Sequence, residues 1–210
     1  MLAADLYIDR LELARYLTPA EAAAAGAADA SDLAVRLRGG ELTLAHLPGL
    51  SPVKRYALSL ALRAREVLPA VQSLELPRPA PGELYEINEP GPEAPVLVTG
   101  NSEFTLTVMT GLLALTVSPF FLLLVDCRGD TVDMAMVYRS FTPQRLDQGL
   151  EAHGLARRVS HRELIIPGIV APLKEELAHY TGWHIRPGPI CAAELPLFLG
   201  EAWQPPPGEG

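Results

Sequence analysis

Polar and small residues follow two apolar segments of the chain, 96–98 and 120–125, where the sequence pattern predicts that strands end. They are Thr99, Gly100, Asn101, Asp126, Gly129 and Thr131. Hydroxyls, a carboxylate and free backbone amides can bind a phosphate or another polar group of a ligand. Ligands of open α/β sheets bind beyond the carboxyl ends of the strands, so these residues mark a candidate ligand site. Turn formation and helix capping account for the same residue types, and both interpretations stay open.

A third loop of small residues follows the apolar segment 164–166. It contains Pro167, Gly168 and Ala171. Small residues allow a planar ligand to approach the backbone closely, and they also suit a tight turn between a strand and a helix. The sequence therefore predicts a second edge of the same site without excluding a purely structural loop.

Other kinds of site lack their sequence patterns. Cys127 and Cys191, the two cysteines, can form neither a disulfide framework nor a complete thiolate site. The spacing of His179 and His184 does not place both rings on one helical face. No G-x-S-x-G nucleophile motif and no glycine-rich nucleotide motif is present. We therefore expect neither hydrolase chemistry nor nucleotide binding.

Strands and helices alternate in the second half of the chain. Strands are expected at 96–99, 120–125, 164–166 and 183–186. One helix is expected to begin after Thr142, with Pro143 at its first position, and to stop at Gly154. Another should run from Pro172 to Gly182. This alternation predicts an α/β fold, a Rossmann-like, mainly parallel sheet with helices on both faces.

The first 68 residues are rich in alanine and predict a small helical domain. Helix starts are expected at Thr18, at Asp29 or Ser31, and at Ser51, where the longest of these helices should begin and continue through Val67. Prolines recur between 69 and 94, which favours an extended linker or an edge segment. We expect domains at 1–68 and 95–203, a proline-rich linker at 69–94 and a disordered tail at 204–210.

Charge and composition narrow the possible partners. A net charge of -8 and a pI near 5.1 argue against a nucleic-acid partner. No signal-like segment follows Met1, so we expect a cytoplasmic protein. Residues 104–125 carry no charge over the length of a membrane helix, about 20 residues, but Ser118 and Pro119 interrupt them. A buried helix, a turn and a buried strand are expected there, and a membrane-anchored module is the weakest hypothesis.

Five segments of the second half occur in an order found in a known family. They read PVLVTGNSEFTLTVM, LLLVDCRGDTV, FTPQRLDQGLEAHGL, VSHRELIIPGIVAPLKEELAHYTGW and GPICAAELPLFL. Together, over residues 95–199, they resemble the corrinoid-binding domain of the corrinoid iron-sulfur protein large subunit, the gamma-type subunit of acetyl-CoA synthase systems. The resemblance implies a cobalamin-type corrinoid cofactor and a methyl-group carrier of the Wood-Ljungdahl type, not an independent enzyme. It also implies a partner, either a second corrinoid-protein subunit or a methyltransferase.

The resemblance places the cofactor beside the three loops already described and adds the helix after the second of them. The implied cofactor-binding residues are Thr99, Gly100, Asn101, Asp126, Gly129, Thr131, Met134, Pro167, Gly168 and Ala171. Met134 stands where the mercury-methylating relative has a cysteine near cobalt. Small residues follow in the relatives, whereas this chain has the bulky segment 136–139. Bulk at this position would narrow the cofactor slot if these side chains pointed inward.

A helical domain ahead of the corrinoid domain holds a four-iron, four-sulfur cluster in the resembled family. Its pattern is C-x2-C-G-x3-C-x2-F-A with a later C-P, and the matching positions here are Ala22, Ala25, Ala30 and Leu47. Such clusters need thiolate ligands, so we expect no iron-sulfur cluster and a domain packed by apolar side chains. Two functional hypotheses follow, a corrinoid-binding carrier and a cofactor-free structural or regulatory homologue that acts as a protein-interaction module.

Overall fold

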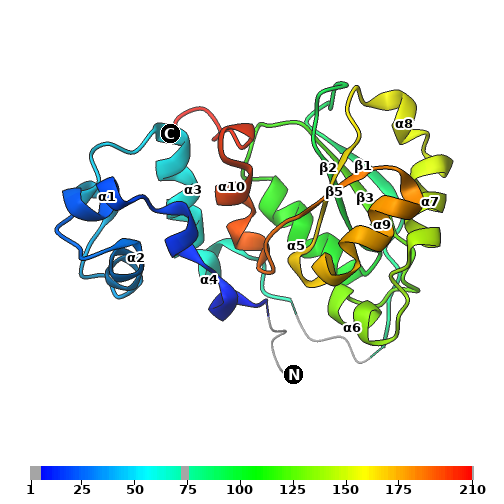
Figure 1. The fold of residues 1–210 in the computed structure, drawn as a ribbon, viewed down its shortest axis with the longest axis horizontal. Coiled ribbons are helices and arrows are strands. Elements are labelled where there is room, and N and C mark those ends of the chain that lie inside the picture. Colours follow the sequence, from blue (N-terminus) through cyan, green and yellow to red (C-terminus); the bar gives the residue numbers. More distant parts are fainter. Residues whose placement is uncertain (1–5, 72–75, 210) are drawn as a thin grey trace.

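A five-stranded sheet forms the centre of the second half of the chain (Figure 1). The structure, a computed structural model, describes residues 6–71 and 76–209. The strands are β1 (Leu84–Ile87), β2 (Val96–Gly100), β3 (Phe120–Val125), β4 (Glu163–Ile166) and β5 (His184–Pro187). They lie in the order β1-β3-β2-β4-β5, with β1 antiparallel to β3 and the other neighbours parallel. The predicted α/β fold with a mainly parallel sheet is confirmed.

Helices cover both faces of this sheet because β3 is apolar on both sides. Phe121, Leu123 and Val125 enter one core, and the alternate residues of β3 enter the other. The first core is covered by α6 (Val132–Val137), α7 (Pro143–Ala152), α8 (Leu155–Arg158), η4 (Gly168–Leu173) and α9 (Lys174–Thr181). The second is covered by α5 (Glu103–Leu113), α10 (Leu195–Leu199) and part of α3 (Pro52–Leu62).

The uncharged stretch 104–125 divides into a helix, a loop and a strand, as the interruption at Ser118 and Pro119 predicted. It forms most of α5, then a loop containing Ser118 and Pro119, and then β3. In residues 6–71 and 76–209 there is no helix with the length and apolar content needed to span a bilayer.

Side-chain caps start the helices of the first part as the sequence predicted. Thr18 forms a capping box with Glu21 at α1 (Pro19–Ala24), Asp29 caps α2 (Ala30–Arg38), and Ser51 caps α3. The helix expected to continue from Ser51 to Val67 is broken at Arg63, where the backbone leaves the helical region, and resumes as α4 (Ala64–Val67). Short 3-10 turns complete this part, namely η1 (Ile8–Arg10), η2 (Leu13–Tyr16) and η3 (Leu44–His46).

The end of the chain packs against the helical part. Cys191, Ala193 and Leu197 belong to the apolar core formed by α1, α2 and α3, and α10 lies beside α3 between the helical part and the sheet (Figure 1). η5 (Ala192–Glu194) and η6 (Gly200–Ala202) flank α10. We expected a disordered tail from residue 204, whereas Gln204 donates its amide hydrogen to Ser118 and accepts from Val117 and Thr116.

The proline-rich segment supplies the edge strand β1. Residues 84–87 pair with β3. A hydrogen bond between His153 and Glu83 (3.2 Å) and an ion pair between Arg158 and Glu86 join this edge to the helices behind it. An edge strand needs hydrogen bonds on one side only, so the prolines that flank β1 are tolerated.

Candidate functional site

A pocket opens where β2 and β4 part. β2 pairs with β3 along its whole length, but its pairing with β4 ends at Leu97 and Ile165. Beyond that pair a cavity of about 420 Å³ lies between the carboxyl ends of the two strands. The chain leaves β2 for β3 on one side and later returns to β4 on the other, so this is the topological switch point of the sheet. Ligands of doubly wound sheets bind at such points.

The pocket wall is mostly apolar and carries a few polar groups. The apolar residues of its wall are Leu6, Leu97, Val98, Phe104, Val108, Met109, Val132, Met134, Ile165, Ile166, Pro167, Ile169, Pro189, Ile190, Ala192 and Leu195. Thr99, Thr105, Thr131 and Asp133 supply hydroxyls and one carboxylate. An apolar cavity with few polar groups is typical of small-molecule and cofactor sites.

Four of the ten residues predicted from the sequence line this pocket. They are Thr99, Thr131, Met134 and Pro167, which come from β2, α6 and the loop after β4. Gly168 lies between the lining residues Pro167 and Ile169, and its amide donates to the carbonyl oxygen of Pro189, another lining residue, at 2.9 Å. A Cβ atom on Gly168 would lie 2.7 Å from the carbonyl oxygen of Gly188, so only glycine allows these two loops to meet.

Three other predicted residues form a hydrogen-bonded corner beyond β3 and do not line the pocket. The Asn101 side-chain oxygen accepts from the amides of Cys127 (2.8 Å) and Gly129 (3.0 Å), and its amide group donates to Asp126 (3.0 Å). Gly129 has φ 81°, and a Cβ there would lie 2.4 Å from the Pro79 nitrogen. Gly100 and Ala171 are not among the pocket-lining residues either.

The segment 78–80 covers the beginning of α5. The first amide of the helix, that of Glu103, donates to the Arg78 carbonyl (2.8 Å), and Ala80 donates to the Asn101 carbonyl (2.7 Å). The Glu103 amide at the start of the helix is therefore bonded within the chain and is not free to bind a phosphate.

The bulky side chains of α6 do not fill the pocket. Val137 is 70% exposed and Tyr138 is 63% exposed, and Met136 packs against the core on the sheet. Met134, 38% exposed, is the α6 methionine that lines the pocket. The direction of these side chains, which sequence reasoning could not give, keeps the pocket open on this side.

Two residues near the N-terminus also line the pocket, and sequence reasoning missed both. Leu6 and Tyr7 lie against it, and the Tyr7 hydroxyl donates to the Asp133 carboxylate at 3.0 Å. The two residues of this hydrogen bond are 126 positions apart in the sequence. No local pattern signals a contact of this kind.

Apolar side chains occupy the positions that match the cluster ligands of the resembled family. Ala22 and Leu47 are buried, and Ala25 and Ala30 pack against the same core. Across the described ranges, no group of three His, Cys, Asp or Glu side chains could hold a metal ion. Burial raises the pKa of the Cys127 thiol to about 12, so this buried sulfur is protonated and unreactive at neutral pH.

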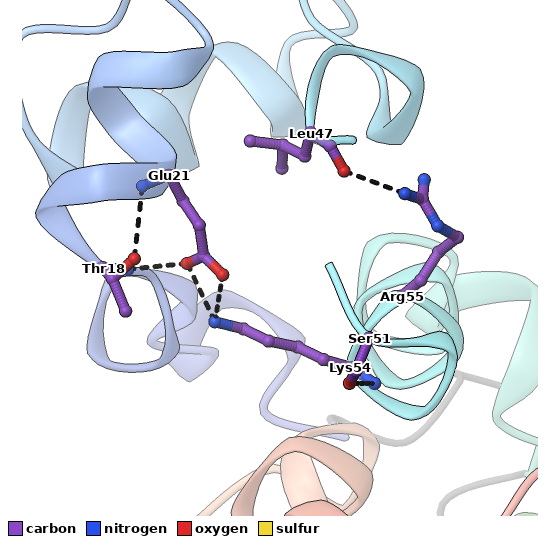
Figure 2. A network of polar contacts seen from close by, with 6 residues as sticks. All are labelled: Thr18, Glu21, Leu47, Ser51, Lys54 and Arg55. Carbon is purple, nitrogen blue, oxygen red and sulfur yellow. Dashed lines mark hydrogen bonds and ion pairs between the residues drawn. The ribbon is translucent and has the colours of Figure 1, made fainter. Parts of the chain in front are cut away.

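Polar contacts join the helices around these positions, as Figure 2 shows. Lys54 on α3 forms an ion pair with Glu21 on α1, with nitrogen–oxygen distances of 2.6 and 2.8 Å. Arg55 donates to the carbonyl oxygens of Leu44 (2.7 Å) and Leu47 (2.8 Å) and thereby fixes η3 against α3. Ion pairs and hydrogen bonds from protein side chains thus hold the helices of this region together.

Comparison with known proteins gives one family. The family described as CO dehydrogenase/acetyl-CoA synthase delta subunit matches residues 29–199. Acetyl-CoA decarbonylase/synthase complex subunit gamma of Methanopyrus kandleri is 34% identical over 116 residues, 55% of this chain and 25% of that protein. The subunit gamma of Archaeoglobus fulgidus is 33% identical over 124 residues, 58% of this chain and 26% of that protein.

A bacterial relative extends further along the chain. The corrinoid/iron-sulfur protein large subunit of Moorella thermoacetica is 32% identical over 162 residues, 72% of this chain and 36% of that protein. The chain thus matches about a quarter to a third of the length of these relatives. Since the family match covers most of the sequence, the chain belongs to the CO dehydrogenase/acetyl-CoA synthase delta subunit family, which confirms the resemblance drawn from its motifs.

Proposed function

We propose that this chain binds a corrinoid of the cobalamin type and serves as a methyl-group carrier subunit. The observation that carries the proposal is the apolar pocket at the switch point of the sheet, which brings together Thr99, Thr131, Met134 and Pro167. A relative whose alignment covers 72% of this chain is named a corrinoid/iron-sulfur protein, which supports the same ligand.

A corrinoid would occupy the pocket only in part. Its volume of about 420 Å³ lies within the range of small-molecule sites, about 300–1,000 Å³, but does not enclose a macrocycle with all its amide side chains. The ring would therefore lie across the pocket mouth, with one face on the protein and the other open to a partner. Gly168 has no side chain and contacts the 188–190 loop closely, so a flat ring could approach the backbone at this position.

The residues of the pocket divide into two roles. The apolar wall, including Val98 and Ile166, would exclude water from one face of the ring. The Thr99 and Thr131 hydroxyls lie where they could bond to the amide groups at the ring edge. Met134, a soft thioether on the pocket wall, would contact the ring from α6. When bound, the cobalt of the corrinoid supplies the methyl-transfer chemistry.

We further propose that the helical part carries no iron-sulfur cluster. Thiolate ligands are missing at the four matching positions, and packed alanine and leucine side chains occupy them. Reduction of the cofactor would then depend on a partner protein. Relatives named as subunits of a complex support the presence of such a partner, a second corrinoid-protein subunit or a methyltransferase.

The test is an anaerobic titration of the full chain with hydroxocobalamin, followed by gel filtration and visible spectroscopy. We expect stoichiometric retention and a spectrum that shifts in Met134→Ala. The matched control is Val137→Ala, which changes an exposed α6 residue outside the pocket and should retain the wild-type spectrum. Failure of folded protein to retain cobalamin, alone or with a partner subunit, would favour the cofactor-free homologue instead.

A further inference from the structure

We propose that residues 6–11 form a strap, a segment of this same chain, that covers the pocket and moves aside when a ligand enters. The contact between strap and pocket stands on the structure alone. The identity of the ligand that displaces the strap rests on the proposed corrinoid function.

The tip of the strap lies against the pocket. Leu6 and Tyr7 are part of the pocket wall, and the Tyr7 hydroxyl bonds to Asp133 in the first turn of α6. Asp133 precedes Met134, which also lines the pocket. A ring lying across the mouth would meet the same α6 surface, so the tip and the ligand compete for it.

The base of the strap is fixed by contacts of its own, although Leu6, Tyr7 and Ile8 also pack, partly buried, against the helical core. Leu11 and Leu13 are buried in the helical core. The Glu12 amide donates to the buried Glu194 carboxylate at 3.0 Å, and the Arg38 guanidinium donates to the Leu11 carbonyl. Release of the tip would leave the contacts of the base in place.

Between tip and base lies a segment suited to act as a hinge. η1 is a single 3-10 turn with no buried residue. Tyr7 has φ 56° and ψ 30°, the left-handed conformation that is unfavourable for a residue with a side chain. The closed tip is therefore held against a backbone preference, and its release relieves that strain.

A strap of this kind raises the apparent Kd of the ligand, because only molecules with an open strap can bind; the apparent Kd is the intrinsic Kd divided by the open fraction. Shortening the tip should bring the apparent Kd back to the intrinsic value. The double variant Leu6→Ala/Tyr7→Ala does so and leaves the base intact. Its matched control is Leu76→Ala/Tyr180→Ala, which removes the same two side-chain types from exposed positions outside the pocket.

The first measurement uses no corrinoid. Thr99→Cys places a thiol on the pocket wall, and both native cysteines are fully buried, so a water-soluble thiol reagent reports on the pocket alone. With the tip shortened, we expect labelling to accelerate about tenfold, the factor that corresponds to about one hydrogen bond. The control pair should leave the rate unchanged. An equal labelling rate with and without the tip would overturn the strap.

The second measurement compares hydroxocobalamin affinity with and without the tip. We expect about tenfold tighter binding to the shortened variant, and a smaller gain in Tyr7→Phe, which keeps the aromatic ring but loses the bond to Asp133. Faster labelling with equal affinities would refute the competition between tip and ligand. Faster labelling with no cobalamin bound by either protein would contradict the corrinoid function and leave the strap standing as a cover of the pocket.

Discussion

Replacement of Glu194 by glutamine should destabilise the protein more than the same replacement of any exposed glutamate. Glu194 is 2% exposed, and its two oxygens accept from the Tyr16 hydroxyl (2.7 Å) and the Glu12 amide (3.0 Å). It therefore joins the 3-10 turn η5 beside α10 to the base of the N-terminal strap. Glutamine keeps the size of the side chain, and its carbonyl oxygen can still accept from the Glu12 amide while its amide group donates to the Tyr16 oxygen, so both bonds lose their charged partner.

The expected loss follows from these two contacts. A hydrogen bond to a charged group contributes about 1.5–3 kcal/mol, whereas one between neutral groups contributes about 0.5–1.5 kcal/mol. Two charged bonds replaced by neutral ones lower the free energy of unfolding by about 2 kcal/mol. For a chain of 210 residues this corresponds to a fall in Tm of about 4–8 °C.

Urea titration and thermal melting of wild type, Glu194→Gln and Glu201→Gln measure this effect. Glu201 lies seven residues later on the exposed surface, so its replacement serves as the control and should change the free energy of unfolding by no more than about 0.5 kcal/mol. If Glu194→Gln matched that control, the carboxylate would not hold the N-terminal segment, and the argument for a fixed strap base would fail.

Three further perturbations test other parts of the structure. Asn101→Ala leaves the amides of Cys127 and Gly129 unpaired and should lower the free energy of unfolding by about 3 kcal/mol in urea titration; an unchanged value would show that the corner is not structural. Burial raises the pKa of Glu21, but the Lys54 hydrogen bond and further contacts outweigh it, so the net pKa is lowered. The stability from this carboxylate is present above about pH 4.3 and is lost as pH falls through the lowered folded pKa. Melting at a series of pH values should therefore show that Lys54→Met loses less stability in acid than wild type does. Identical acid profiles of the two proteins would refute this. Burial, followed by the hydrogen bond to Glu194, raises the pKa of Tyr16. The resulting stability is complete below about pH 10 and is lost as pH rises, because the unfolded state ionises first; Tyr16→Phe should show a shallower alkaline fall in urea titration, and an equal slope would contradict the assignment.

Local signals in the sequence predicted much of the fold. Capping residues such as Thr18 and Thr142 and the left-handed glycines Gly154 and Gly182 act within one turn of the chain, so the helix limits they set appear in the structure. The apolar run 120–125 likewise specified a buried central strand. β1 was less clear, because its pairing with β3 depends on residues about 40 positions apart.

The candidate site was only partly predictable for the same reason. Alternation of strands and helices placed Thr99 and Pro167 at the carboxyl ends of strands, and the pocket lies there in the structure. The polar residues Asn101 and Asp126 are equally good turn formers, and in the structure they bond to each other. Whether Tyr138 points inward, and whether Tyr7 reaches the pocket, depends on tertiary packing that no local pattern encodes.

The most direct test of corrinoid binding at this pocket uses the methionine methyl groups as reporters. Met109 and Met134 line the pocket, whereas Met136 packs on the sheet core. In protein labelled with ¹³C at these methyl groups, stoichiometric hydroxocobalamin should shift the Met109 and Met134 resonances strongly and that of Met136 weakly. Unchanged spectra, or a shift confined to Met136, would contradict a corrinoid at the parted ends of β2 and β4.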